Sequence, residues 1–196
     1  WLNLKSEETY KGFGVSACAT CDGFFFKDKE VAVVGGGNAA AEEAIFLTKF
    51  ASKVKLIHRR NKLRAEKLLQ TKLMNNKKIE IVWDSVVEDI IGQKDPKSVT
   101  RIKIKNLKTN SVSELKIDGL FIAIGHIPAT SIFKGQLNMD KEGYILTKPD
   151  STATNIPGVY AAGDVKDKVF RQAITAAGMG CMSALEAEKF LSEKSS

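Results

Sequence analysis

The amino-acid sequence predicts an α/β fold, in which helices cover a sheet of mainly parallel strands. Short apolar segments rich in β-branched residues alternate with segments of helical composition, which is the pattern of a βαβ unit. Farther along the chain, strand-like segments follow one another with only turns between them. This second pattern indicates an antiparallel β insertion in the parallel sheet.

The βαβ unit begins at Val31–Val34, a short apolar run that fits a buried parallel strand. Three glycines follow, and Asn38–Phe50 then reads as a helix rich in alanine and glutamate. Lys53–His58 contains alternating charged and apolar residues, as expected of a second strand. A further helix is expected over Arg64–Asn75.

The antiparallel insertion is predicted after this helix, where the β-branched content rises. We expect strands in Ile79–Ile91 and Val99–Leu107, with a turn at Asp95–Pro96 between them. Ser113–Lys116 is expected to add another strand. Gly119–Gly125 is almost continuously apolar and should return to the parallel sheet.

The sequence changes character after this apolar run. Ile127–Pro157 is loop-like, with scattered glycine, proline and asparagine. A last strand is expected at Gly158–Ala162 and a helix at about Arg171–Leu191. We therefore expect two domains, residues 1–126 and residues 127–196.

Composition restricts the class of protein. The 196 residues are 43% hydrophobic and 27% charged, and no apolar run approaches the roughly 20 residues of a membrane span. Three cysteines are too few for a secreted disulfide scaffold, which favours a reducing, cytoplasmic location. The chain starts at Trp1 without an initiating methionine, so we expect it to be cut or processed from a longer one.

A glycine-rich loop joins the first strand to its helix. Gly35, Gly37 and Ala40 match the pattern G-x-G-x-x-A in the context of a Rossmann-like dinucleotide-binding fold. Side chains at the glycines would keep a pyrophosphate from the backbone N–H groups of the first helical turn. The alternative is a tight turn that binds no ligand. The residues predicted to contact the cofactor are Gly35, Gly36, Gly37, Asn38, Ala39 and Ala40.

The second strand ends in basic residues where an NAD-binding protein would place an acid. Arg59, Arg60 and Arg64 can form charge-assisted hydrogen bonds with a 2′-phosphate, so we predict NADP(H) rather than NAD(H). They belong to a run of ten Lys and Arg and one acid between Lys53 and Lys78, within a net charge of +7. Because this basic run lies where the 2′-phosphate of NADP(H) would bind, the cofactor accounts for the positive charge, and nucleic-acid binding is not favoured.

A C-x-x-C pair, Cys18 and Cys21, precedes the glycine loop, with Asp22 directly after it. The pair alone indicates either a redox centre or half of a metal site; a tetrahedral zinc site would need two further ligands, so no metal is expected. Asp22 could deliver or accept the proton that thiol–disulfide exchange requires. Nicotinamide transfers a hydride, which thiols do not usually accept directly, so a flavin is expected between them.

The sequence resembles the low-molecular-weight thioredoxin reductases, whose motifs it carries in the family's order. The C-terminal stretch is the longest and most specific of these matches. The matching segments are CATCDG (Cys18–Gly23), GGGNAAAEEA (Gly35–Ala44), HRRNKLRAEK (His58–Lys67), GLFIAIGHIP (Gly119–Pro128) and GVYAAGDVKDKVFRQAITAAGMGCMSALEAEKFL (Gly158–Leu191).

The resemblance implies a reaction cycle in which NADPH reduces FAD, FAD reduces the Cys18–Cys21 disulfide, and the dithiol reduces thioredoxin. It also implies that Cys18 attacks the partner, that Cys21 faces the flavin, and that Asp22 transfers protons. Residues 1–126 would be the NADPH domain and residues 127–196 the C-terminal segment of a split FAD-binding domain. The flavin contacts implied by the family are Asp164, Arg171, Gln172 and Ala173.

The family's first FAD-binding half has no counterpart in this sequence, so the resemblance implies a fragment with an incomplete FAD site and uncertain activity of its own. The full-length enzyme would be a homodimer, with no nucleic-acid or membrane partner. Two alternatives stay open: a flavoprotein reductase of a peroxidase partner, and a non-catalytic NADP-binding module. Cys181 is expected to be a buried, small apolar residue of the last helix, and the triplet Phe24–Phe26 to pack beneath the dithiol loop.

Overall fold

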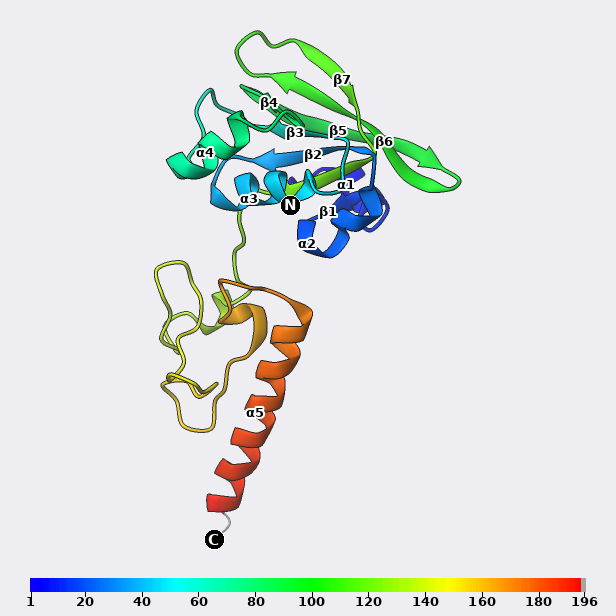
Figure 1. Ribbon diagram of the computed structural model, residues 1–196. Coiled ribbons are helices and arrows are strands. Elements are labelled where there is room, and N and C mark those ends of the chain that lie inside the picture. Colours follow the sequence, from blue (N-terminus) through cyan, green and yellow to red (C-terminus); the bar gives the residue numbers. More distant parts are fainter. Residues whose placement is uncertain (195–196) are drawn as a thin grey trace. The chain divides into compact units, whose positions relative to one another are not determined.

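A computed structural model describes residues 1–194 (Figure 1). The chain divides into two compact units, Trp1–Gly125 and the segment from His126 onward. The first unit contains both β-sheets, and the second consists of loops and a long helix, α5 (Ala173–Lys194). The division lies beside the expected boundary, while the function assigned to each part stays a prediction.

The first unit is built on a parallel sheet of five strands in the order β1-β8-β2-β3-β4. Val33 of the central strand aligns with Leu56 on one side and Phe121 on the other, so the predicted βαβ unit and the return of the apolar run to the sheet are confirmed. The strands are β1 (Val15–Ser16), β2 (Glu30–Gly35), β3 (Lys53–Ile57), β4 (Ile79–Val82) and β8 (Gly119–Ala123).

Both faces of this sheet are covered, which explains the almost continuous apolar runs of its strands. On one face, Val31 and Val33 pack with buried residues of helices α3 (Asn38–Leu47) and α4 (Lys67–Met74). On the other face, Ala32 packs with a second sheet. The alternation of successive side chains along β2 therefore joins three layers into one unit (Figure 1).

The second sheet is the predicted antiparallel insertion, with strands β5 (Ser85–Lys94), β6 (Lys97–Asn106) and β7 (Val112–Lys116). The predicted turn at Asp95–Pro96 joins the first two strands and is confirmed. The β-rich stretch over residues 79–91 does form strands, but it divides between the two sheets, with β4 in the parallel one and β5 in the antiparallel one. Asp84, with a φ of 53°, adopts a left-handed conformation that ends β4 and lets β5 start in the other sheet.

Three short elements at the start of the first unit were not predicted from the sequence. They are the helices α1 (Lys5–Tyr10) and α2 (Ala19–Asp22) and the 3-10 turn η1 (Gly23–Phe26), which are too short to show an apolar periodicity. Helix α4 begins at Lys67 rather than Arg64. The preceding residues are held in a loop instead, as described below.

The second unit contains α5, which confirms the predicted C-terminal helix, and two 3-10 turns, η2 (Ser131–Phe133) and η3 (Gly163–Val165). The expected strand at Gly158–Ala162 was wrong: within the described chain, only an isolated bridge joins Tyr160 to Ala153. A β-strand needs a neighbouring strand that pairs with it along its length. Within the described chain, Gly158–Ala162 has no such partner strand.

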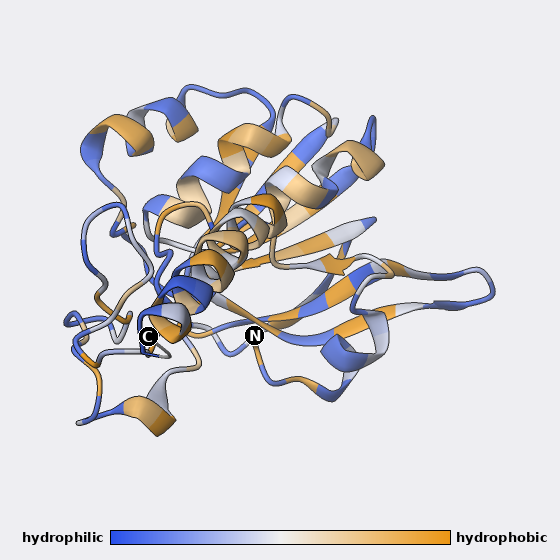
Figure 2. Cartoon of the chain, turned by 90° about the horizontal axis from the view of Figure 1, so that it is seen from below, coloured by the Kyte–Doolittle hydropathy of each residue, from blue (hydrophilic) through white to orange (hydrophobic). Residues whose placement is uncertain are grey.

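Helix α5 has no buried residue among those described, although Figure 2 shows hydrophobic residues along it. Cys181, expected to be buried, is exposed because no described layer covers its face of the helix. Glu186 fastens the helix to the loop before it by accepting hydrogen bonds from Ser151 Oγ (2.5 Å) and the Thr152 N–H (2.9 Å). The bond from Ser151 is the main reason that the pKa of Glu186 is lowered.

Within residues 1–194, no helix is both long enough and apolar enough to span a membrane.

Gly36→Ala tests the packing of the parallel sheet against β3. A Cβ built at Gly36 would overlap the buried ring of His58, which hydrogen bonds through Nε2 to the Lys62 carbonyl oxygen. Overpacking of this kind costs about 1–3 kcal/mol, so thermal unfolding followed by circular dichroism should show a Tm several degrees lower. An unchanged Tm would contradict the packing described here. Gly37→Ala is the control, because open space surrounds that position.

Candidate functional site

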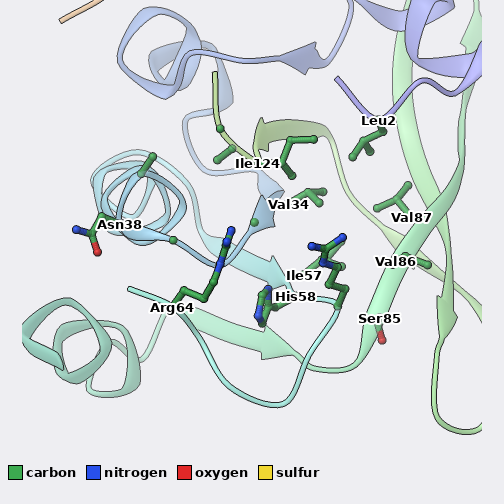
Figure 3. Close-up of a pocket in the computed structure, with 17 residues that line it drawn as sticks. Leu2, Val34, Asn38, Ile57, His58, Arg64, Ser85, Val86, Val87 and Ile124 are labelled. Atoms are coloured by element: carbon green, nitrogen blue, oxygen red, sulfur yellow. The ribbon is translucent and has the colours of Figure 1, made fainter. Parts of the chain in front are cut away.

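A pocket of about 530 Å³ lies where β2, β3 and β8 end (Figure 3). This carboxyl edge is where open parallel sheets place their ligands. The loop Gly35–Gly37 lines the pocket, and α3 starts directly after it at Asn38. Gly37 has no side chain to cap the first-turn N–H groups of α3, so these donors are suited to an anionic group.

The three glycines serve different purposes. A Cβ at Gly35 would overlap the Ala123 carbonyl oxygen and the Ala40 Cβ, and one at Gly36 would overlap His58. These two glycines therefore allow close packing of strand, helix and loop. A Cβ at Gly37 would meet no atom within 4 Å, so its absence leaves room on the pocket side. The loop thus fits the close approach of a dinucleotide pyrophosphate.

Two of the three arginines predicted at the site line this pocket. They are Arg59 and Arg64, and both are exposed. Figure 3 shows the Arg64 side chain directed towards the glycine loop. Arg60 is exposed but does not line the pocket. The structure therefore brings Gly35–Gly37, Asn38 and Ala39 together with two guanidinium groups, while Ala40 is buried behind the loop.

Sequence reasoning missed several residues of the pocket. His58 is buried beneath Gly36, with its ring centroid 6.2 Å from that of Trp83 in an edge arrangement. Its position at the end of β3 was the available signal. Other missed residues come from distant parts of the sequence, which no local pattern connects; among them are Leu2, Ser85, Val86, Val87 and Ile124.

The two predicted redox cysteines, Cys18 and Cys21, form a disulfide with a Cα–Cα distance of 5.3 Å. Cys18 is half-buried at the start of α2, and its Sγ accepts a hydrogen bond from the Cys21 N–H at 3.2 Å. The Cys18 N–H donates to Ser16 Oγ at 3.0 Å. Cys21 is exposed, so the disulfide can be reached from the surface.

Asp22 is half-buried at the end of α2 and lines a second pocket of about 320 Å³ with Ser16 and Phe25. The expectation that the phenylalanine triplet packs beneath the dithiol was only partly right. Phe26 is buried with its ring centroid 5.3 Å from that of Phe121, whereas Phe24 and Phe25 are 68% and 70% exposed. An aromatic surface therefore lies next to the disulfide.

The disulfide and the nucleotide pocket are separate features of one unit. Neither Cys18 nor Cys21 lines the 530 Å³ pocket. The dithiol follows β1 at one edge of the sheet, whereas the pocket lies over β8, β2 and β3.

The residues predicted to contact a flavin all lie in the second unit. Asp164 is exposed in η3, and Arg171 and Gln172 directly precede Ala173, the first residue of α5. Sequence reasoning missed Asp167, which organises this segment. Its buried carboxylate accepts hydrogen bonds from the N–H groups of Val169, Phe170 and Arg171 at 2.9–3.0 Å and from the Thr175 hydroxyl at 3.3 Å.

Burial alone would raise the pKa of Asp167, but the hydrogen bonds that it accepts outweigh burial and lower the pKa. The carboxylate is therefore kept ionised, and it fixes Arg171 in a left-handed conformation with a φ of 50°. The guanidinium of Arg171 then reaches the Tyr144 hydroxyl at 3.4 Å.

In the described part of the chain, no group of three His, Cys, Asp or Glu side chains could hold a metal ion.

Comparison with known proteins places this geometry in context. Residues 2–180 match the family model described as pyridine nucleotide-disulphide oxidoreductase. A thioredoxin reductase of Rickettsia conorii is 58% identical over 193 residues, which is 98% of this chain and 62% of that protein. A thioredoxin reductase of Coxiella burnetii is 58% identical over 198 residues, which cover 97% of this chain and 61% of that protein.

Solved structures agree with the sequence comparison. The thioredoxin reductase of Streptococcus pyogenes matches with a TM-score of 0.92 and 44% identity, over 98% of this chain and 62% of that one. That of Giardia duodenalis matches with a TM-score of 0.87 and 47% identity, over the same shares. The chain thus spans about three-fifths of the length of these relatives.

Gly37→Ala should weaken nucleotide binding without destabilising the fold. The added methyl group would occupy the open space on the pocket side of the loop, where a pyrophosphate would approach. We expect a loss of affinity for NADPH of about tenfold or more by isothermal titration calorimetry, with an unchanged Tm. Equal affinity in the variant and the unchanged chain would show that the phosphates do not bind at this loop.

Proposed function

The chain belongs to the pyridine nucleotide-disulphide oxidoreductase family, and on this premise we propose that it carries the NADPH-binding and dithiol parts of a thioredoxin-disulfide reductase. The observation that supports this proposal is the pairing, in one unit, of a glycine-loop pocket containing two arginines with an accessible C-x-x-C disulfide. The relatives named thioredoxin reductase support the choice of reaction.

The first unit, expected as residues 1–126, is the proposed NADPH domain. The glycine loop and the start of α3 hold the pyrophosphate, and Arg59 and Arg64 hold the 2′-phosphate. The apolar residues Leu2, Val87 and Ile124 offer contacts for the uncharged parts of the nucleotide. Arg60 belongs to the same basic segment and is proposed as a weaker, outer contact.

The segment from residue 127 onward is proposed as part of a flavin-binding domain. When bound, FAD accepts a hydride from a nicotinamide and delivers two electrons to a disulfide. Asp164, Arg171, Gln172 and Ala173 are the proposed flavin contacts of this chain. Asp167 keeps the second of these, Arg171, in a fixed conformation through the hydrogen bonds that it accepts from the N–H groups of residues 169–171. The exposed apolar side chains of α5 fit a segment that packs within a larger domain.

The proposed reaction of the cysteines balances in electrons and protons. Two electrons and two protons convert the Cys18–Cys21 disulfide into two thiols, and Asp22 transfers a proton at this site. The Cys18 thiolate then attacks the disulfide of thioredoxin, forming a mixed disulfide and releasing one partner thiol. Cys21 attacks Cys18 Sγ, which restores the internal disulfide and releases the second partner thiol.

The exposed aromatic rings of Phe24 and Phe25, next to the disulfide, support a protein rather than a small molecule as the acceptor. A peroxidase subunit would meet the same surface, so it is the alternative partner. Homodimer assembly of the full-length enzyme and a cytoplasmic location are also proposed, in line with a dithiol that works in a reducing compartment.

The preference for NADPH is tested with Arg59→Ala and Arg64→Ala. Each variant removes a charge-assisted hydrogen-bond donor from the pocket, so the dissociation constant for NADPH should rise about tenfold or more. That for NADH, which lacks the 2′-phosphate, should barely change. Arg60→Ala is the matched control, with a smaller expected loss because Arg60 does not line the pocket. Equal losses for NADPH and NADH would contradict the assignment of the arginines.

The thiol exchange is tested on the chain itself, in a Cys181→Ser background that removes the third, exposed cysteine. The chain is reduced, freed of reductant and mixed with oxidised thioredoxin or an oxidised thiol peroxidase. We expect loss of the chain's two thiols and gain of two thioredoxin thiols. Adding Cys21→Ser should trap a mixed disulfide through Cys18, detected by mass spectrometry.

Two outcomes of this exchange would change the proposal. A stable mixed disulfide with Cys18→Ser, and none with Cys21→Ser, would reverse the roles of the two cysteines. Exchange with the peroxidase but not with thioredoxin would replace the proposed partner. Binding of NADPH without exchange with either partner would favour a non-catalytic NADP-binding module.

A further inference from the structure

The segment Arg59–Glu66, here called the arginine loop, leaves β3 and returns to the glycine loop before α4 begins. At its far end, the N–H groups of Arg64 and Ala65 donate to the Gly36 carbonyl oxygen at 2.7 and 3.1 Å. Arg64 is therefore anchored through its backbone to the glycine loop itself. Its exposed guanidinium forms no hydrogen bond or ion pair with residues 1–194, so the side chain can still change rotamer.

A second connection joins the two loops through side chains. Asn38 Oδ1 accepts a hydrogen bond from the Glu66 N–H at 2.9 Å, and Asn38 Nδ2 donates to Glu66 Oε1 at 3.1 Å. Asn38 is the first residue of α3, and Glu66 is the residue before α4. This reciprocal pair therefore ties together the starts of two helices that are 28 residues apart in the sequence.

The pair raises an electrostatic problem. Glu66 is an exposed acid, two residues after an arginine proposed to bind a phosphate, so its charge alone would oppose an anionic ligand. Its carboxylate, however, is engaged with the Asn38 amide at the mouth of the pocket. The hydrogen bond from Asn38 to Glu66 thus favours binding of an anionic ligand by holding the loop in place, whereas the negative charge of Glu66 opposes it. Substitutions of Glu66 can separate these two effects.

We propose that Glu66, acting through Asn38, is a positioning residue that holds the arginine loop against the glycine loop and so sets the preference for a 2′-phosphate. This inference rests on the proposed NADPH site and assigns a determinant of its specificity. Holding the loop in place removes part of the ordering cost that Arg59 and Arg64 would otherwise meet when a ligand binds.

The test compares 2′,5′-ADP with 5′-AMP, which differ only in the 2′-phosphate, by calorimetric titration of the chain. Glu66→Ala should weaken 2′,5′-ADP about three- to tenfold and 5′-AMP by less than about twofold. Glu66→Gln keeps the acceptor for Asn38 Nδ2 and loses the charge, so 2′,5′-ADP should bind at least as well as to the unchanged chain. Glu42→Ala, which removes an exposed acid of α3 outside the pocket, controls for net charge.

A double variant distinguishes positioning from independent effects. In an Asn38→Ala background, Glu66→Ala should cause no further loss of preference, because the pair is already broken. A full additional loss there would overturn the inference. So would equally tighter binding of 2′,5′-ADP by Glu66→Ala and Glu66→Gln, since charge alone would then explain both. An unchanged chain that binds neither probe would instead overturn the proposed nucleotide site, and this inference with it.

Discussion

The close backbone approach at the turn from β2 to α3 is the constraint on which the nucleotide pocket depends. Gly35 brings the loop onto Ala123 and Ala40, and Gly36 lies directly on the His58 ring. The carbonyl oxygen of Gly36 also accepts the two N–H groups that anchor the arginine loop. One turn without side chains therefore sets the distances between three strands, a helix and a loop, and a larger residue would separate them.

The sequence predicted what depends on local pattern. A parallel strand buried on both faces has a continuous apolar run, so β2 and β8 could be recognised without knowledge of their neighbours. It did not predict that residues 79–91 divide between two sheets, because the division depends on one left-handed residue, Asp84. The glycine loop was predictable in detail, whereas the choice among three neighbouring arginines depends on the path of the loop.

The second unit shows the same limit more clearly. Helix α5 satisfies its backbone hydrogen bonds within its own segment, so its sequence was sufficient to predict it. The residues at Gly158–Ala162 have a strand-like composition, but a strand forms only with a partner along its length, and the described residues offer only an isolated bridge. Asp167 was missed because an acid between lysines suggests a solvated loop. Only the folded path shows the four donors that stabilise its burial.

The presence of a dithiol and a nucleotide pocket in one unit restricts how electrons could pass between them. Both are fixed to the same parallel sheet, the dithiol after β1 and the pocket at the ends of β2, β3 and β8. Neither cysteine lines the pocket, so in the proposed reaction FAD would carry the electrons between the two sites. Ile124 and Gly125 line the pocket and are also the last two residues of the first unit, so the end of that unit forms part of the pocket wall.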